Sequence, residues 1–239
     1  EIKRMTQISV IVATYNWPAA LGLCLQSLKN QSFRDFEILI ADDGSKEETR
    51  NLIQKYIQEF PIKITHLWHE DIGCRKTIIG NRAINSANGQ YLIFLDGDCV
   101  VQPDYLQRHL SLAQKGYLVT GSRILLNQKF TQEILTEGYI DFSRLQKNSF
   151  FLRIQGSINK FLPLFIKFGN GKWRNYKKFF WRRIKGCNMA CWREDARAIK
   201  GFDETLIGWG HEDADFIFRL ENKGIIRKSG SWSTEVIHL

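Results

Sequence analysis

LIFLDGDCVV, residues 92–101, is an apolar run that breaks on two carboxylates, Asp96 and Asp98, before apolar residues resume. The run before the break is typical of a buried strand, so both acids stand where that strand ends. Two carboxylates in such a place cost desolvation energy unless a cation neutralises them. The stretch therefore predicts a strand of a buried sheet that ends at a polar site.

The chain before this stretch repeats one order, a short apolar strand followed by an amphipathic helix. Alternation of this kind predicts an α/β fold, with a mainly parallel central sheet flanked by helices. After about residue 126 the pattern is less regular. The expected strands are 7–14, 36–43, 62–71, 91–98, 117–125 and 233–239; the expected helices are 17–30, 46–60, 77–88, 104–116 and 211–224; and 185–195 is expected to be a loop.

Length and composition are those of a globular protein. The 239 residues are 44% hydrophobic and include no run of eighteen apolar residues, and the first residues lack the apolar core of a signal peptide. We therefore expect a soluble or peripheral protein. The five cysteines are scattered without CxxC spacing, which favours reduced thiols in the cytoplasm over disulfides or a zinc site.

The ends of the expected strands are polar and mostly acidic. In open α/β sheets, ligands bind outside the carboxyl ends of the strands. An acidic site there repels an anionic ligand unless a divalent cation lies between them, and Mg²⁺ or Mn²⁺ takes hard oxygen ligands. Arg75 and Lys76 offer positive charge for a diphosphate. The residues themselves therefore predict a metal-bridged nucleotide diphosphate beside Tyr15, Asn16, Asp42, Asp43, Glu70, Asp71, Asp96 and Asp98.

Parts of this pattern have simpler explanations. Ser45 with Glu48 three residues later matches a helix capping box, and Asp-Gly is a common turn. A single Asp-x-Asp is a weak signal for a metal, because short acidic turns are frequent. Neither explanation accounts for two acids at the end of an apolar strand.

Four segments resemble one family. ISVIVATYN (8–16), ILIADDGS (38–45), GNRAINSANGQYLIFLDGDC (80–99) and GWGHEDADFIFRL (208–220) together resemble the inverting family 2 glycosyltransferases of the GT-A fold. Bacterial capsule and lipopolysaccharide transferases and chondroitin polymerase domains are similar, and the last segment resembles the C-terminal motif of β-1,4-galactosyltransferases. The resemblance covers most of the chain except its basic stretch.

The resemblance implies a UDP-sugar donor and assigns residues to it. Ala13 and Tyr15 would line the nucleotide pocket, with Tyr15 beside the uracil. Asp43 would accept the uracil N3 hydrogen, which favours uridine over other bases. Asp96 would contact the ribose or the hydration shell of the metal, and Arg75 falls near the nucleotide.

The resemblance also implies a divalent metal, Mn²⁺ or Mg²⁺. Asp98 would ligate it directly, with Asp96 beside it. A histidine downstream of the GWGxED motif completes the site in related enzymes, and here that residue is His238. Spacing alone favours an ordinary histidine at this position, although a neutral imidazole suits Mn²⁺.

The GWGHEDADF segment combines an acidic helix start with a flexible aromatic loop. Acids are favoured in the first turn of a helix, and Asp215 can pair with Arg219 one turn later. The residues alone do not separate Glu212 from Asp213 or exclude Asp215 as the catalytic acid. By resemblance, Asp213 is the general base and Glu212 orients the acceptor or donor sugar. Trp209, between two glycines, suits a loop that closes over a sugar. GCNMAC (186–191) matches a segment near the donor sugar and acceptor, and its simpler explanation is a strand with small residues.

One segment carries the excess positive charge. Residues 144–185 contain twelve Lys and Arg and no acid, whereas the chain as a whole has a net charge of +9. Ten aromatic residues lie between 150 and 181. A solvated basic face does not explain these rings, and no nucleic-acid motif accompanies them, so we expect no nucleic-acid partner. An anionic membrane surface fits better, and an acidic glycan acceptor also fits.

Together these observations predict a metal-dependent, inverting, UDP-sugar-dependent hexosyltransferase of bacterial capsule or lipopolysaccharide synthesis. Its acceptor would be a glycan or lipid-linked glycan, at the cytoplasmic face of the plasma membrane. Residues 1–125 would bind the donor, and 126–239 would bind the acceptor and carry the catalytic base. A sugar nucleotidyltransferase would need a glycine-rich, Arg-containing loop after the first strand, and 13–22 has none. The other alternative is an inactive transferase scaffold that binds membrane or nucleic acid.

Overall fold

The computed structural model describes residues 7–208 and 210–239. Its centre is a seven-stranded sheet in the order β3-β2-β1-β4-β8-β6-β9. Strands β1 to β4 are parallel, β8 runs antiparallel to both β4 and β6, and β9 is parallel to β6. The strands are β1 (Ile8–Thr14), β2 (Phe36–Asp42), β3 (Ile64–Trp68), β4 (Tyr91–Asp96), β6 (Tyr117–Thr120), β8 (Asn188–Trp192) and β9 (Ile226–Ser229). The predicted α/β fold with a mainly parallel sheet is confirmed.

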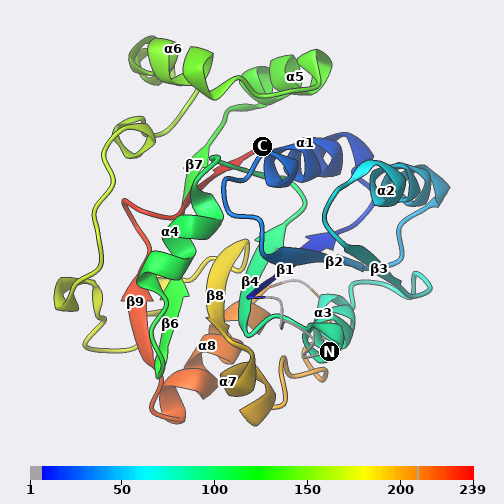
Figure 1. Ribbon diagram of the computed structural model, residues 1–239, viewed down its shortest axis with the longest axis vertical. Coiled ribbons are helices and arrows are strands. Elements are labelled where there is room, and N and C mark those ends of the chain that lie inside the picture. The colour runs from blue at the N-terminus through cyan, green and yellow to red at the C-terminus, as the bar shows by residue number, and fades with distance from the viewer. Residues whose placement is uncertain (1–6, 209) are drawn as a thin grey trace.

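Helices cover both faces of this sheet (Figure 1). Apolar side chains of α1, α2 and α4 pack on one face, and those of α3, α7 and α8 pack on the other, so the sheet separates two apolar cores. The central strands are buried on both faces, which explains their continuous apolar sequences. The helices are α1 (Pro18–Lys29), α2 (Glu47–Glu59), α3 (Lys76–Ser86), α4 (Tyr105–Leu112), α5 (Gln128–Glu137), α6 (Phe142–Ile154), α7 (Arg193–Ala198) and α8 (Glu212–Asn222).

A second, three-stranded sheet adjoins the carboxyl end of β4. It consists of β5 (Cys99–Val101), β10 (Glu235–His238) and β7 (Ser122–Leu125), with β10 in the middle. A third apolar core lies beneath it, against α5 and α6. Because β10 pairs with β5, the last strand returns to the residues that follow β4.

Two sequence predictions fail where the sheets meet. The strand expected at 117–125 is divided at Gly121, so that β6 and β7 belong to different sheets. The side chain of Asn188 occupies the space beside Gly121, where an added Cβ would lie 2.2 Å from the Asn188 amide nitrogen. The segment 185–195, expected to be a loop, contains β8, which fills the gap between β4 and β6.

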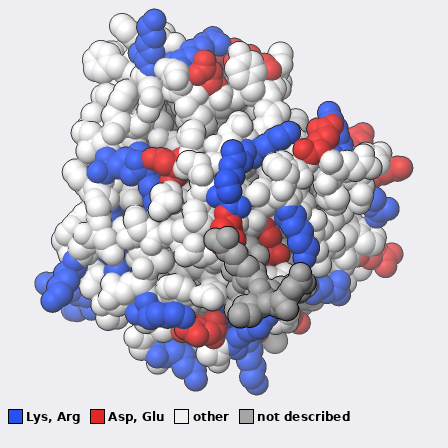
Figure 2. Space-filling model, in the orientation of Figure 1, with Lys and Arg blue, Asp and Glu red and all other residues white. Residues whose placement is uncertain are grey.

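The basic segment 144–185 is partly structural. It runs from α6 through three short 3-10 turns, Leu162–Leu164, Lys172–Arg174 and Trp181–Arg183, to the start of β8. Arg174 is buried, and its guanidinium donates to four backbone carbonyls, those of Phe168, Gly169, Ser229 and Ser231. Figure 2 shows Lys and Arg spread over the face in view among uncharged residues, without one continuous basic patch. None of the described helices has both the length and the apolarity needed to cross a bilayer.

Candidate functional site

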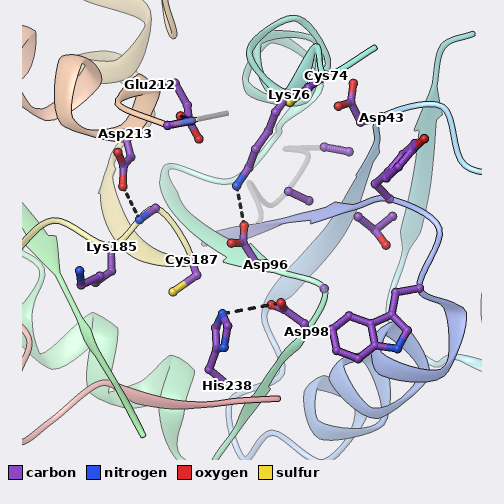
Figure 3. A pocket seen from close by; sticks show the side chains of 18 of the residues that line it. Asp43, Cys74, Lys76, Asp96, Asp98, Lys185, Cys187, Glu212, Asp213 and His238 are labelled. Carbon is purple, nitrogen blue, oxygen red and sulfur yellow. Dashed lines mark hydrogen bonds and ion pairs between the residues drawn. The ribbon is translucent and has the colours of Figure 1, made fainter. Parts of the chain in front are cut away.

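A cavity of about 820 Å³ opens at the carboxyl ends of β1, β2 and β4 (Figure 3). The ends of these parallel strands form one wall. Residues 184–187 before β8, the start of α8 and the end of β10 form the opposite wall. The predicted site residues that line the cavity are Ala13, Tyr15, Asp43, Asp96, Asp98, Glu212, Asp213 and His238. Residues from both halves of the chain therefore meet here.

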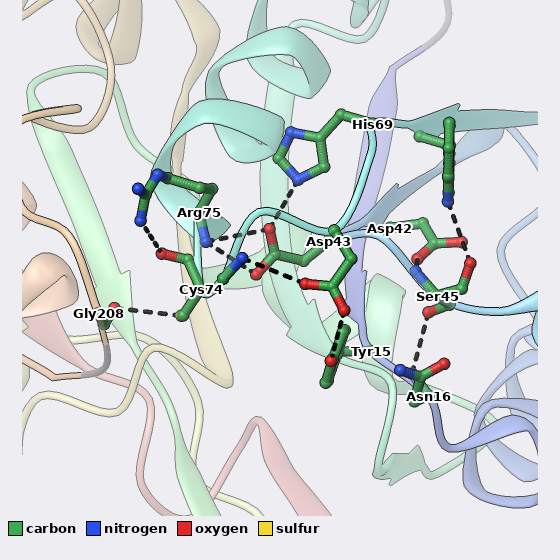
Figure 4. Close-up of polar contacts among 12 residues, drawn as sticks. Tyr15, Asn16, Asp42, Asp43, Ser45, His69, Cys74, Arg75 and Gly208 are labelled. Atoms are coloured by element: carbon green, nitrogen blue, oxygen red, sulfur yellow. Dashed lines mark hydrogen bonds and ion pairs between the residues drawn. The ribbon is translucent and has the colours of Figure 1, made fainter.

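Asp43 is fixed by donors on the loop that follows β3 (Figure 4). His69 Nε2 lies 2.7 Å from Asp43 Oδ1, and the backbone N–H of Arg75 donates to both carboxylate oxygens at 3.1 and 3.0 Å. The Arg75 guanidinium donates instead to the Cys74 carbonyl at 3.2 Å, and it is not part of the cavity lining. Arg75 thus reaches Asp43 through its backbone.

The two acids of the DDGS motif have separate environments. Asp42 is buried and accepts hydrogen bonds from the Ser45 N–H at 2.8 Å and from His66 Nε2 at 2.8 Å. Burial by itself raises the pKa of Asp42, but these hydrogen bonds outweigh it and hold the pKa below its ordinary value. Only Asp43 faces the cavity.

The capping box expected for Ser45 and Glu48 is wrong. The helix begins at Glu47, after Lys46, and no side chain caps it. The Ser45 hydroxyl instead accepts from the backbone N–H of Asn16 at 2.9 Å. This bond ties the loop after β1 to the loop after β2, beside Tyr15, whose hydroxyl donates to Asp71 at 2.9 Å.

Asp96 forms an ion pair across the cavity with Lys76, the first residue of α3, with 2.8 Å between Nζ and Oδ1. Burial opposes a charged ammonium, but the Asp96 carboxylate outweighs it and raises the pKa of Lys76. A lysine in the first turn of a helix is unfavourable for the helix dipole. A lysine at such an unfavourable position in a sequence therefore indicates that a negatively charged partner holds it there.

Asp98 lies opposite His238, with 3.6 Å between Oδ2 and Nε2. The pairing of β10 with β5 brings His238 to this point from the far end of the chain. Burial and the neighbouring Asp96 raise the pKa of Asp98 above its usual value, against the effect of His238. Two carboxylates and an imidazole that face one cavity are a donor set suited to Mn²⁺ or Mg²⁺.

Asp213, in the first turn of α8, accepts two hydrogen bonds from backbone N–H groups. Its Oδ2 accepts from the Gly186 N–H at 2.7 Å, and its Oδ1 accepts from the Ala214 N–H at 2.7 Å. Glu212 lines the same wall, and its Oε2 accepts from the Gly210 N–H at 3.1 Å. Asp215 does not line the cavity.

The loop that leads into α8 has an unusual backbone. Gly208 and Gly210 have φ of 98° and 105°, and His211 has φ of 69°. Glycine reaches such angles without strain, which explains the two glycines of the motif. The Gly208 carbonyl accepts from the Cys74 thiol at 3.1 Å. Trp209, expected to contact the acceptor, lies outside the described residues.

Sequence reasoning missed several residues of the cavity wall. Arg123 on β7 and Lys185 add positive charge to it, and Cys74 adds a thiol. The GCNMAC segment was expected near the donor sugar and acceptor, and its Gly186 and Cys187 line the cavity. No local pattern marks Arg123, because the break at Gly121 places β7 in the second sheet.

Family models match most of the chain. The model described as glycosyl transferase family 2 matches residues 9–180, and the model described as the N-terminal domain of galactosyltransferase matches residues 172–230. The two matches together include all of the cavity-lining residues except His238.

Curated relatives are longer than this chain. Validoxylamine A glucosyltransferase of Streptomyces hygroscopicus subsp. jinggangensis is 29% identical over 97% of this chain, which covers 56% of that protein. Chondroitin synthase of Pasteurella multocida is 27% identical over 91% of this chain, which covers 23% of that protein. The chain thus spans about half of the first relative and about a quarter of the second.

Solved structures share the fold. Mannosyltransferase PcManGT from Pyrobaculum calidifontis, solved with GDP-Man and Mn²⁺, superposes with a TM-score of 0.65 at 16% identity, over 99% of this chain and 57% of that one. This likeness confirms the predicted GT-A architecture.

Proposed function

The chain belongs to glycosyl transferase family 2, a family of sugar-transferring enzymes, and from this membership we propose that it transfers a hexose from a UDP-sugar to a hydroxyl with inversion. One observation carries the proposal. The carboxylate of Asp213, oriented by the Gly186 N–H, faces the same cavity as Asp43 and Asp98. One bound donor could therefore lie near the proposed general base (Asp213), the proposed hydrogen-bond acceptor for uracil (Asp43) and the proposed metal ligand (Asp98).

The donor nucleotide would lie over the ends of β1 and β2. Ala13 and Tyr15 would line the pocket of the base, and Asp43 would accept the uracil N3 hydrogen. His69 and the Arg75 N–H leave Asp43 little freedom to rotate, which supports selection by hydrogen bonding. Asp96 would meet the ribose, and Lys76, its present partner, supplies positive charge near the diphosphate.

The metal would be held by Asp98 and His238, with Asp96 beside them. A divalent cation at this place would neutralise the diphosphate and so make it a better leaving group. Carboxylate and imidazole ligands support Mn²⁺ or Mg²⁺.

Asp213 would act as the general base. Its carboxylate would take the proton of the acceptor hydroxyl while the hydroxyl oxygen forms a bond to the anomeric carbon. The bond from that carbon to the diphosphate oxygen would break, and its electron pair would leave with UDP. Glu212 would orient the acceptor, together with Trp209. Because one displacement suffices, no second nucleophile is required.

We further propose that residues 1–125 bind the donor, whereas 126–239 bind the acceptor and supply the base. The acceptor would be a glycan or lipid-linked glycan of bacterial capsule or lipopolysaccharide synthesis, met at the cytoplasmic face of the plasma membrane. Exposed rings on segment 144–185, among them Phe151 at 65% and Trp173 at 62% exposure, support an interfacial position.

The test is a panel of UDP-sugars and GDP-mannose, incubated with Mn²⁺ and scored by release of the nucleotide. We expect UDP release from at least one UDP-sugar, less from GDP-mannose, and loss of release with EDTA. Nucleotide release that persists in EDTA would contradict the proposed metal dependence. Nucleotide binding without release, for every sugar and acceptor extract tried, would favour the inactive-scaffold alternative.

Selection of the uracil base can be tested with two matched variants. Asp43→Asn should weaken UDP binding by about tenfold, because an amide N–H would meet the uracil N3–H. Asp42→Asn should change UDP binding much less, since Asp42 faces His66 and Ser45 and not the cavity. Equal effects of the two variants would contradict the role of Asp43.

A further inference from the structure

Two thiols lie near His238, that of Cys187 on the cavity wall and that of Cys99 buried. Cys99 follows Asp98 directly, and the pairing of β5 with β10 sets it opposite His238. Cys187 precedes β8 and lines the cavity. The two sulfurs and a ring nitrogen of His238 all lie within 4.8 Å of one another. Figure 3 shows the Cys187 sulfur close to the His238 ring.

The Asp98 carboxylate borders two of these three groups, His238 and Cys99. Asp98 Oδ2 is 3.6 Å from His238 Nε2, and Asp98 Oδ1 accepts from the Cys99 thiol at 3.6 Å. Bond lengths of about 2.0–2.3 Å in a tetrahedral zinc site place neighbouring ligand atoms about 3.3–3.8 Å apart. One Asp98 oxygen is already at that spacing from His238 and the other from Cys99. Small side-chain rotations would let one of these oxygens join Cys99, Cys187 and His238 around one ion.

We propose that Cys99, Cys187 and His238, with Asp98 as a fourth ligand, form a binding site for Zn²⁺ that overlaps the proposed transfer-metal site. The two sites share His238 and Asp98, so that Zn²⁺ bound to the thiols takes both residues from Mn²⁺ or Mg²⁺. Zinc is therefore an inhibitor of this chain. The binding site stands on the geometry alone, whereas the inhibition rests on the proposed function.

Ligand chemistry separates the two metals. Thiolates select Zn²⁺ over Mn²⁺ and Mg²⁺, which prefer carboxylate, imidazole and water. Zn²⁺ binding releases the protons of both thiols to solvent, so two thiolates and one carboxylate surround the ion. The ion enters from the cavity, because Cys187 and His238 face it while Cys99 is fully buried.

The other buried thiols lack this setting. Cys191 lies on β8 opposite Leu92 in the apolar core, and Cys24 lies on α1. Neither belongs to a group of three possible ligands within the described part of the chain. Cys191 is therefore a matched control for Cys187, from the same strand region and with a similar burial.

The experiment is a titration of the metal-free, reduced protein with Co²⁺, a spectroscopic substitute for Zn²⁺, followed by displacement with Zn²⁺. We expect a thiolate-to-cobalt charge-transfer band that saturates at one ion per chain, disappears on Zn²⁺ addition and survives excess Mg²⁺. Cys99→Ala and Cys187→Ser should each lose at least half of the band, whereas Cys191→Ser keeps it. A wild-type protein without the band overturns the proposal whether or not the variants fold, and so does a band that both variants retain in full.

A second experiment measures inhibition of the transfer activity by Zn²⁺. With Mn²⁺ as the transfer metal, Zn²⁺ should inhibit nucleotide release by the wild-type chain and by Cys191→Ser, and Cys187→Ser should need at least tenfold more Zn²⁺ for the same inhibition. Equal sensitivity of Cys187→Ser and Cys191→Ser would overturn the shared-ligand relation. Absence of release under all conditions would count against the proposed function alone, because the cobalt band reports the thiol site independently.

Discussion

Asp213 is held in one position because each carboxylate oxygen accepts a backbone hydrogen bond. In the proposed role of general base, a carboxylate that is already oriented loses little entropy when the acceptor binds. The strand ends and the acidic helix start were readable from the sequence, because each acid interrupts or begins an apolar pattern. The residues that contact these acids could not be predicted from the sequence. Gly186, Lys76 and His69 come from other elements, and only the fold brings them to these acids.

Replacement of Asp213 by Asn tests this residue. We expect kcat to fall by about 10²–10⁴, because an amide cannot take the acceptor proton, while the donor dissociation constant stays nearly unchanged. The measurement is UDP release together with donor binding by calorimetry.

Asp215→Asn is the matched control, two residues further along in the first turn of the same helix. Asp215 forms a partly exposed ion pair with Arg219 and does not line the cavity. Such a pair contributes little to stability, so this variant should keep most of its turnover. Near-normal turnover of Asp213→Asn with bound donor would remove Asp213 from the proposed role.

At the scale of the elements, Asn188 joins the two sheets. Its amide donates to the carbonyls of Ser122 and Thr234, and its oxygen accepts from the Tyr105 hydroxyl. Strand and helix positions in the first half followed from apolar periodicity. The break at Gly121 did not, because its cause is a side chain almost seventy residues later in the sequence.

Gly121→Ala should therefore destabilise the fold. The added methyl would meet the Asn188 amide at 2.2 Å, and overpacking of this kind costs about 1–3 kcal/mol. The free energy of unfolding in urea gives the measurement. Gly169→Ala is the control, because nothing lies within 4 Å of its added Cβ. Equal stability of the two variants would show that the Asn188 side chain can move aside at little energetic cost.

His109 on α4 makes the same junction sensitive to pH. It is fully buried against Tyr105, and burial lowers its pKa to about 3, against the hydrogen bond to Asn188. The unfolded chain protonates this histidine near pH 6.5 while the folded chain does not. The stability from the neutral ring is thus complete above pH 6.5 and declines as the pH falls towards 3.

Between pH 7 and pH 5, the wild-type chain should lose about 2 kcal/mol of unfolding free energy through His109. His109→Gln cannot take up that proton, so it should lose correspondingly less over the same range, whatever its stability at pH 7. Urea unfolding of both proteins at the two pH values measures the difference. Identical losses would contradict a buried, neutral His109.

At the scale of the whole molecule, the proposed membrane contact depends on exposed charge next to exposed rings. Lys177, Lys178, Arg182 and Arg183 are all exposed, beside Trp181 at 50% exposure. The sequence predicted this segment as basic and aromatic. It did not predict that Arg174 is internal, because burial of a guanidinium requires carbonyls that distant segments supply.

Neutralising these four residues to Gln should reduce binding to vesicles that contain anionic lipid, by about tenfold or more at low salt. Co-sedimentation with such vesicles and with neutral ones provides the measurement. The control removes the same charge from four scattered, exposed sites, Lys55, Arg82, Lys129 and Lys223. If both fourfold variants bind alike, net charge alone accounts for the binding and the segment has no special part.

The position of β8 between β4 and β6 sets an order on the assembly of the protein during translation. Until residues 188–192 leave the ribosome, β4 has an unpaired edge, although β1 and β2 can already stand beside it. An unpaired edge on an apolar strand invites pairing with other chains. A nascent chain that pauses between residues 125 and 188 is therefore the species that chaperones must shield, and fragments that stop there should aggregate where the whole chain does not.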